Sequence, residues 1–287
     1  MSVIAFIPAR GGSKSIPEKN IKSFCGKPLI YWNLNELQKS DVDEIVVATD
    51  SDKIKSVVES FNFSKVKVYD RSSENSQDTS STESVMLEYI NSSNLSDSDI
   101  FMLVQATSPF TQTIHFNEGL ELFNNHDSIL SCCVSKKFTW KEDGQALNYD
   151  IYNRPRRQDY KGDLIENGAF YISLVSDIIE TGNRISGKIG IYQMPEYTCT
   201  EIDEIEDWIV SFVKQSVPHQ KYLNLEDKEG ISDYWNDEPT IRDSVRDYIL
   251  FLLLTGKRKT EVSNLTWSNV DFKKLRIRYM HLTTLEQ

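Results

Sequence analysis

The fold of this chain is constrained most by an alternation, over residues 1–134, of short β-rich apolar runs with segments of helical periodicity. This alternation is typical of a parallel sheet with helices on both faces. The apolar runs predict strands at Val3–Ile7, Glu44–Thr49, Lys65–Tyr69, Ile100–Gln105 and Ser128–Val134. The segments between them predict helices at Leu29–Lys39, Asp52–Ser60, Ser81–Ser92 and Ile114–Asn124. Because ligands of such open sheets bind beyond the carboxyl ends of the strands, residues that follow each strand are expected to carry the chemistry.

Residues 136–165 interrupt the alternation with a polar, aromatic and Arg-rich stretch that has no helical periodicity. This stretch is too long for a plain connection, so we expect an excursion that serves as a dimer contact or a lid. The pattern resumes with strands at Ala169–Ser173 and Lys188–Met194, followed by a helix at about Glu204–Gln215. Asp203, with a glutamate three residues later, predicts the N-terminal cap of that helix.

The distribution of charge indicates how the 287 residues are divided. Residues 221–287 hold equal numbers of basic and acidic side chains, so the net charge of -11 belongs entirely to the residues before them. We expect one domain over 1–217, a polar linker over 218–239 and a small α-rich appendage over 240–287. The acidic balance disfavours a general polyanion-binding surface, although one cleft can still concentrate cations.

The composition is that of a soluble globular protein, with 39% hydrophobic and 26% charged residues. No apolar run approaches the roughly 18 residues that cross a membrane, and the first residues do not resemble a signal peptide. The four cysteines form no C-x-x-C pair, which disfavours a zinc site or a disulfide framework. We therefore expect a cytoplasmic protein without membrane contact.

A glycine-rich, cationic loop over residues 8–20 follows the first predicted strand at once. Its two glycines let backbone N–H groups approach phosphate oxygens, while Arg10, Lys14 and Lys19 can neutralise a triphosphate. Its spacing is neither the dinucleotide-binding G-x-G-x-x-G nor the P-loop G-x-x-x-x-G-K-[ST]. The loop predicts a nucleotide site of another kind, and the alternative is a solvated basic loop.

This loop and six further blocks together resemble the acylneuraminate cytidylyltransferases, which are the CMP-sialic acid synthetases. The blocks occur in the same order over about residues 3–215, and this ordered coincidence is stronger than any single match. They are residues 7–20, Ala-Thr-Asp-Ser at 48–51, Arg-Ser-Ser-Glu at 71–74 with 78–82, Gln-Ala-Thr-Ser-Pro at 105–109, Arg-Pro-Arg-Arg-Gln-Asp at 154–159, Glu-Asn-Gly-Ala-Phe-Tyr at 166–171, and 202–203 with 207–208. The resemblance implies a Rossmann-like, mostly parallel sheet of the nucleotide-diphospho-sugar transferase type.

The resemblance also implies which residues bind CTP and an acidic nine-carbon sugar. Those expected to hold the nucleotide are Arg10, Gly11, Gly12, Ser13, Asn20, Arg71, Ser81 and Thr82. Those expected to face the sugar are Gln105, Arg157, Glu166 and Tyr171. A planar guanidinium at Arg157 would match the sugar carboxylate. Those expected to carry catalysis, by positioning and charge neutralisation, are Arg10, Lys14, Lys19 and Asp203.

Mg²⁺ is the expected cofactor, and Asp203 is its first expected ligand. Mg²⁺ is usually held by one or two carboxylates with substrate phosphates and water. The family often has Asp-x-Asp here, whereas this chain has Glu-Ile-Asp. Glu201, the second candidate ligand, is therefore expected to bind through a water or not at all. Asp207 is expected to stabilise the first turn of the following helix.

The reaction implied by the resemblance is attack of the sugar's anomeric hydroxyl on the α-phosphorus of CTP, with loss of pyrophosphate. Legionaminic acid, pseudaminic acid and the eight-carbon acid KDO remain open as alternative substrates. The four histidines lie outside the matched blocks, so no general base is identified. The resemblance further implies a homodimer in which residues 136–165 reach across.

Residues 241–279 resemble the opening of a tyrosine-recombinase (phage integrase) catalytic domain, through residues 247–262, Leu-Thr-Trp at 265–267 and Val-Asp-Phe at 270–272. Arg258 occupies the position of an arginine that helps hold the scissile phosphate in that family. No H-x-x-R block or nucleophilic tyrosine follows, so we expect an inactive helical fragment. A DNA-binding recombinase relic is the alternative function. The neutral charge of this segment argues against nucleic-acid binding, because such affinity rests on neutralising phosphates.

Overall fold

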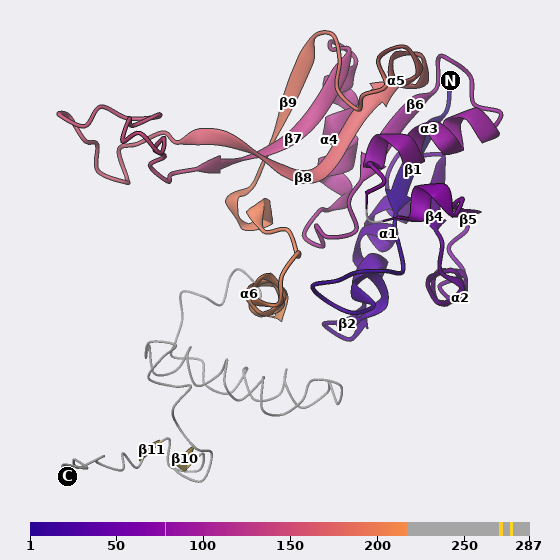
Figure 1. Ribbon diagram of the computed structural model, residues 1–287, viewed down its shortest axis with the longest axis horizontal. Coiled ribbons are helices and arrows are strands. Elements are labelled where there is room, and N and C mark those ends of the chain that lie inside the picture. The colour runs from indigo at the N-terminus through magenta and orange to yellow at the C-terminus, as the bar shows by residue number, and fades with distance from the viewer. Residues whose placement is uncertain (78, 217–269, 272–275, 278–287) are drawn as a thin grey trace. The chain divides into compact units, whose positions relative to one another are not determined.

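The computed structural model describes residues 1–77 and 79–216, together with the short antiparallel strand pair β10 (Val270–Asp271) and β11 (Arg276–Ile277) (Figure 1). The chain divides into two compact units, Met1–Asn224 and Leu225–Gln287. Apart from β10 and β11, the expected linker and the integrase-like segment lie outside the described residues. Among the helices that the structure describes, none is long and apolar enough to cross a membrane.

A seven-stranded sheet lies at the centre of the first unit, in the order β5-β4-β1-β6-β8-β7-β9. Its strands are β1 (Val3–Pro8), β4 (Glu44–Thr49), β5 (Val66–Asp70), β6 (Ile100–Val104), β7 (Ser128–Ser135), β8 (Asp163–Leu174) and β9 (Ile189–Met194). β8 is antiparallel to both of its neighbours, and the other neighbouring pairs are parallel. The predicted mostly parallel sheet is confirmed.

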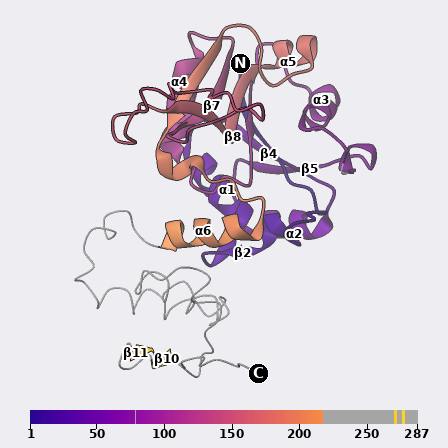
Figure 2. The same cartoon turned by 60° about the vertical axis from the view of Figure 1, so that its left-hand side comes forward.

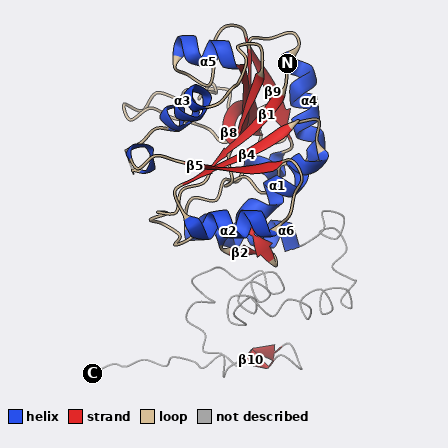
Figure 3. Cartoon of the chain, turned by 90° about the vertical axis from the view of Figure 1, so that its right-hand side faces the viewer, coloured by secondary structure: helices blue, strands red, loops and turns tan. Residues whose placement is uncertain are grey.

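Helices cover both faces of this sheet (Figure 3). They are α1 (Leu29–Lys39), α2 (Asp52–Ser60), α3 (Thr82–Ser92), α4 (Thr113–Phe123) and α5 (Val175–Thr181). A further helix is α6 (Ile205–Ser216). Successive residues of a strand point to opposite faces. Ala5 and Ile7 therefore join the core with α1, α2 and α4, whereas Ile4 and Phe6 join the core with α3 and α5. Burial on both faces explains why β1 is a continuous apolar run.

Serine side chains fix where two of the helices begin. The hydroxyl of Ser51 accepts the backbone N–H of Ile54 at 3.4 Å, and that of Ser81 accepts the N–H of Ser84 at 3.1 Å. Each bond satisfies one of the N–H groups that a helix N-terminus leaves without an intrahelical partner. Ser81 is thus the cap of α3 rather than its first helical residue.

The excursion expected over residues 136–165 is an arm that projects from the sheet (Figure 1). Its base is the continuation of β7 and β8, which pair as far as Ser135 and Asp163. Its outer part is held by aromatic contacts, with the ring centroids of Phe138 and Tyr149 at 4.3 Å. The guanidinium of Arg154 lies 4.7 Å from the Phe138 ring centroid. β8 is longer than predicted because residues 163–166, Asp-Leu-Ile-Glu, are all exposed and lack the pattern of a buried strand.

α6 packs against a small hairpin that the sequence analysis missed, formed by β2 (Ser23–Phe24) and β3 (Lys27–Pro28) (Figure 2). The rings of Phe24 and Trp208 meet edge to face, with centroids at 5.4 Å. The prediction that Asp203 caps α6 was wrong. Instead, the carboxylate of Asp207 accepts the backbone N–H groups of Asp203 at 3.2 Å and Glu204 at 2.9 Å.

The short 3-10 helices are Lys19–Ile21, Glu74–Ser76 and Glu196–Cys199.

Candidate active site

Two cavities open beyond the carboxyl ends of β1 and β6, where ligands of such sheets bind. The Asp203 cavity, of about 350 Å³, is lined by Pro8, Arg10, Ser13, Lys19, Asn20, Gln105, Thr107, Glu201 and Asp203. The α3 cavity, of about 270 Å³, is lined by Pro8, Arg10, Arg71, Gln77, Ser80, Ser81, Thr82, Val85 and Gln105. Pro8, Arg10 and Gln105 line both, so the two cavities form one site in two parts.

This site brings together most of the residues that the sequence singled out, from segments as far apart as Arg10 and Asp203. Those that line neither cavity are Gly11, Gly12, Lys14, Arg157, Glu166 and Tyr171. Lys14 is exposed on the loop, and Arg157 is exposed on the arm. The residues that line the site but were not predicted are Pro8, Gln77, Ser80, Val85 and Thr107. Ser80 and Thr107 belong to the matched blocks, so the blocks carried a signal for them.

The glycine-rich loop is fixed over the end of β4 and does not extend freely into solvent. The N–H of Gly11 donates to Asp50 Oδ1 at 2.9 Å. A Cβ at Gly11 would lie 2.9 Å from the Cβ of Ser51, so the close approach requires glycine. Asn20, which is 7% exposed, donates its side-chain amide to the Arg10 carbonyl at 3.1 Å. Asp50 thus already accepts the Gly11 N–H, and the contact of this loop with a phosphate stays a prediction.

A second internal contact positions Gln105. The side-chain amide of Asn33, a fully buried residue of α1, donates to the Gln105 carbonyl at 2.9 Å. A buried polar side chain is costly unless it is hydrogen-bonded. An asparagine on the apolar face of a predicted helix was the sequence signal from which this contact with Gln105 could have been predicted.

One wall of the Asp203 cavity is an ion pair between Lys19 and Asp203. The Lys19 ammonium lies 3.0 Å from Asp203 Oδ1 and donates to the Ile202 carbonyl at 2.8 Å. The Lys19 side chain is 13% exposed and that of Asp203 is 63% exposed. The lysine is held in place, whereas the carboxylate faces the cavity and solvent.

Glu201 lies beside this pair in a less polar setting. Burial, followed by repulsion from Asp203 and Glu166, raises the pKa of the Glu201 carboxyl to about 7. Its carboxylate occupies the space over Gly168, where φ is +63° and a Cβ would overlap Glu201 Oε1. Gly168 therefore makes room for the carboxylate.

The carboxylates of Glu201 and Asp203 suit a hard divalent cation, because such a cation would neutralise their mutual repulsion. Within residues 1–77 and 79–216, no group of three or more His, Cys, Asp or Glu side chains could hold a metal ion. A cation here would need oxygens from a substrate or water as well. Such a ligand set is the usual one for Mg²⁺.

The α3 cavity presents the guanidinium of Arg71. Burial lowers the pKa of Arg71, although Asp50 and Glu88 act in the opposite direction. The guanidinium donates to the Asn75 carbonyl, and its buried Nε has no hydrogen-bond partner among the described residues. Glu88 fixes the loop that carries Arg71. Its carboxylate accepts the N–H of Ser72 at 2.8 Å and the Ser72 hydroxyl at 2.7 Å. The cavity wall thus carries a fixed cation with donor capacity to spare.

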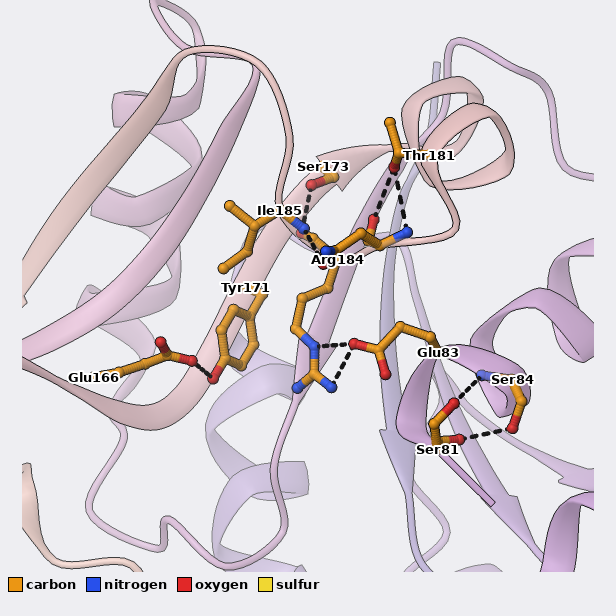
Figure 4. Close-up of polar contacts among 10 residues, drawn as sticks. Ser81, Glu83, Ser84, Glu166, Tyr171, Ser173, Thr181, Arg184 and Ile185 are labelled. Carbon is orange, nitrogen blue, oxygen red and sulfur yellow. Dashed lines mark hydrogen bonds and ion pairs between the residues drawn. The ribbon is translucent and has the colours of Figure 1, made fainter. Parts of the chain in front are cut away.

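Glu166 and Tyr171 line neither cavity. The Tyr171 side chain is 4% exposed, and its hydroxyl donates to the Glu166 carboxylate (Figure 4). Burial and that hydrogen bond raise the pKa of Tyr171. The expectation that Glu166 and Tyr171 face the sugar stays a prediction.

The family model described as "Cytidylyltransferase" matches residues 4–229, and the chain belongs to this family. It is 37% identical over 236 residues to N-acylneuraminate cytidylyltransferase B of Danio rerio, an alignment that covers 79% of this chain and 54% of that protein. It is 28% identical over 232 residues to a pseudaminic acid cytidylyltransferase of Campylobacter jejuni, covering 77% of this chain and 99% of that protein. The chain thus spans about half the length of the first of these relatives.

Solved structures support the same fold. A CMP:2-keto-3-deoxy-manno-octonic acid synthetase complexed with CTP superposes with a TM-score of 0.55 at 17% identity, over 75% of this chain and 99% of that one. A 4-diphosphocytidyl-2C-methyl-D-erythritol synthase from Anaerococcus prevotii superposes with the same TM-score at 15% identity, again over 75% of this chain and 99% of that one. At these identities the likeness concerns the fold alone.

Proposed function

We propose that this protein transfers CMP from CTP to the anomeric hydroxyl of a sialic-acid-type 2-keto sugar acid and releases pyrophosphate. The observation that carries the proposal is that Arg10, Lys19 and Asp203 line one cavity at the carboxyl ends of the strands. That cavity is continuous with a second one lined by Arg71 and the start of α3. Similarity to relatives named N-acylneuraminate cytidylyltransferase supports the choice of substrates.

In this proposal the α3 cavity takes the cytidine, with Ser81 and Thr82 at the base and ribose and Arg71 at their edge. The triphosphate passes Arg10, which lines both cavities, and reaches Lys19. The sugar acid occupies the Asp203 cavity beside Gln105. The described cations of the site follow this path in order, which is the arrangement that a triphosphate requires.

The chemical step forms a bond between the anomeric oxygen and the α-phosphorus and breaks the bond to the bridging oxygen of pyrophosphate. The hydroxyl proton passes to solvent water, and the charge that develops on the phosphoryl oxygens is neutralised by Arg10 and Lys19. His115 is unsuited to take the proton because it is 5% exposed and its Nδ1 accepts the Gln112 N–H at 3.1 Å. Catalysis in this scheme rests on positioning and electrostatics.

We propose Mg²⁺ as the cofactor, held by Asp203, with Glu201 bound to it through a water or not at all. When bound, it would supply further neutralisation of the phosphate charge. Asp203 is the more accessible of the two carboxylates. Burial, and after it repulsion from Asp203 and Glu166, raise the pKa of Glu201, and a bound cation would relieve the repulsion.

We also propose a homodimer in which the arm over residues 136–165 reaches the partner's site. Its exposed apolar side chains support this: Trp140 is 49% exposed, Leu147 55%, Ile151 51% and Tyr152 93%. Apolar surface of this kind is typical of contact sites. Arg157 lies on the same arm, outside the cavities of its own chain, and would meet the sugar carboxylate of the partner's site.

Several finer assignments belong to the same proposal. Legionaminic acid, pseudaminic acid and KDO are alternative acceptors for the same chemistry. Residues 1–217 are proposed as the catalytic unit, which acts in the cytoplasm, where nucleoside triphosphates are available. Residues 240–287 are proposed as an integrase-like fragment without activity or nucleic-acid binding.

Nucleotide choice is the first test of this proposal. Pyrophosphate release is measured with N-acetylneuraminic acid, Mg²⁺ and each of CTP, UTP and ATP. The proposal expects release with CTP above the others. Release with ATP in preference to CTP would leave the fold intact and remove the cytidylyltransferase assignment.

A further inference from the structure

Arg184, in the connection between α5 and β9, joins the start of α3 to β8 (Figure 4). Its Nε donates to Glu83 Oε1 at 2.6 Å, and another nitrogen of the guanidinium lies 2.6 Å from the same oxygen. The guanidinium carbon lies 5.0 Å from the ring centroid of Tyr171. The Arg184 and Glu83 side chains are only 20% and 25% exposed. The contact is therefore more shielded than a typical surface ion pair.

The backbone around Arg184 is itself anchored to the sheet. The hydroxyl of Ser173, on β8, donates to the Arg184 carbonyl at 2.8 Å. The N–H of Ile185 donates to Asn183 Oδ1 at 3.2 Å, which tightens the turn. The backbone of Arg184 is thus held against β8, and its guanidinium reaches toward α3.

On the other side of the contact, Glu83 directly follows two residues of the α3 cavity wall. Ser81 caps the helix, Thr82 is its first residue, and both line that cavity. The Glu83 carboxylate also lies in the first helical turn, where negative charge is favourable. A shift of Glu83 would displace this wall, because the three residues belong to one cap and turn.

Arginine suits this position better than lysine. A planar guanidinium can donate to a carboxylate and stack on an aromatic ring at the same time, whereas an ammonium is a point charge. Tyr171 is held in turn by the hydrogen bond from its hydroxyl to Glu166. Arg184 therefore links α3 to a ring whose place on β8 is already determined.

We propose that Arg184 is a positioning residue, which holds the first turn of α3 against β8 and thereby sets the affinity of the α3 cavity for the cytidine part of CTP. This inference rests on the proposed function for the identity of the ligand. It adds a residue that lies outside the matched sequence blocks and lines neither cavity.

The test compares R184Q, R184K, E83Q and the double variant R184Q/E83Q with the wild type. Calorimetry gives the Kd for CTP, steady-state kinetics give kcat and each KM, and thermal melts report folding. K67Q is the control, since it removes a positive charge from the 2.6 Å Lys67–Glu44 pair, which lines neither cavity. R184Q is expected to raise the Kd and KM for CTP about five- to tenfold, the size expected for losing one shielded ion pair and one cation–π contact. The KM for the sugar acid and kcat are expected to change less than about twofold.

Further outcomes decide between positioning and general stability. E83Q should raise the Kd for CTP in the same direction, the double variant should add little to R184Q, and R184K should recover part of the affinity. K67Q should bind CTP as the wild type does. A wild-type Kd for CTP in folded R184Q and E83Q would overturn the inference, as would equal losses in every parameter that follow the melting temperature.

The calorimetric readout separates this inference from the proposed function. If the wild type binds CTP but releases no pyrophosphate with any sugar acid, the function fails while the effect of Arg184 on CTP binding is still measured. If the wild type does not bind CTP, both fail. If it is active and R184Q binds CTP unchanged, only the inference on Arg184 fails.

Discussion

The ammonium of Lys19 lies 3.0 Å from the carboxylate of Asp203, although 184 positions separate them in the sequence. The contact joins the loop after β1 to the segment before α6. It puts a cation suited to phosphate next to a carboxylate suited to a metal ion, within one cavity.

Replacing Asp203 should damage turnover far more than folding. The Asp203 side chain is 63% exposed, and a pair this exposed contributes little to stability. D203N is expected to lower kcat by about a hundredfold or more, since it removes the first proposed metal ligand. Pyrophosphate release and a thermal melt measure the two effects. A loss of activity matched by an equally large loss of stability would contradict the role.

Asp207 provides the matched control, because its carboxylate caps the N-terminus of α6. It accepts the backbone N–H groups of Asp203 and Glu204 at the start of α6. D207A is expected to lower the free energy of unfolding by about 0.5–2 kcal/mol, the usual effect of a lost helix cap. Urea unfolding measures it. A D207A variant with wild-type stability and no activity would reverse the roles of the two aspartates.

Gly168 should tolerate no side chain, for two separable reasons. Its φ of +63° costs an L-residue about 1–2 kcal/mol, and a Cβ would also displace the Glu201 carboxylate. Gly182 has a φ of +66°, and a Cβ there would meet no described atom within 4 Å. G182A should therefore lose stability alone, whereas G168A should lose stability and activity. Equal activity in the two variants, measured by pyrophosphate release, would show that the place of Glu201 is unimportant.

Glu201 should make stability depend on pH. Its pKa in the folded protein is about 7, above the ordinary value of 4.5, so the folded chain keeps a proton that the unfolded chain loses between these values. Raising the pH through that window therefore favours unfolding. In the presence of a chelator, E201Q should gain stability relative to the wild type between pH 5 and pH 8, as measured by urea unfolding. A difference that stays constant with pH would contradict the raised pKa.

The proposed dimer predicts complementation between two inactive chains. If Arg157 completes the partner's site, a mixed dimer of R157A and D203N contains one intact site. Random pairing on co-expression should then restore about a quarter of the wild-type activity. The measurement is pyrophosphate release from the co-expressed pair beside each variant alone. No recovery in a mixture shown to contain mixed dimers would place Arg157 outside the partner's site.

Much of the fold could be predicted from local patterns. The bounds of β4, α1 and α2 agree with the predictions, because β4 is a continuous apolar run, the two helices have a clear period, and each element has a polar boundary. The direction of β8 could not be predicted, since an apolar run shows burial but not which way the strand runs. The hairpin of β2 and β3 was missed because strands of two residues have no period to detect.

In the candidate site, too, some residues could be predicted from local patterns and others could not. Arg10 and Gln105 follow β1 and β6 and line one cavity, because these parallel strands end at one edge of the sheet. Their contact with a ligand stays a prediction. Tyr171 could not be placed, because neighbouring residues of a strand face opposite sides and the side that meets the cavity depends on tertiary packing. The contact of Arg184 with Glu83 spans 101 positions and belongs to no motif, so only the structure reveals it.

The most direct test of the central claim is pyrophosphate release by the purified full chain with CTP, Mg²⁺ and a panel of acidic sugars. The panel holds N-acetylneuraminic, legionaminic and pseudaminic acids and KDO, with D203N as the paired control. The account predicts release that depends on both the metal and a sugar acid, fastest with N-acetylneuraminic acid and nearly abolished in D203N. Failure of every sugar acid to support release, with the wild type folded, would contradict it.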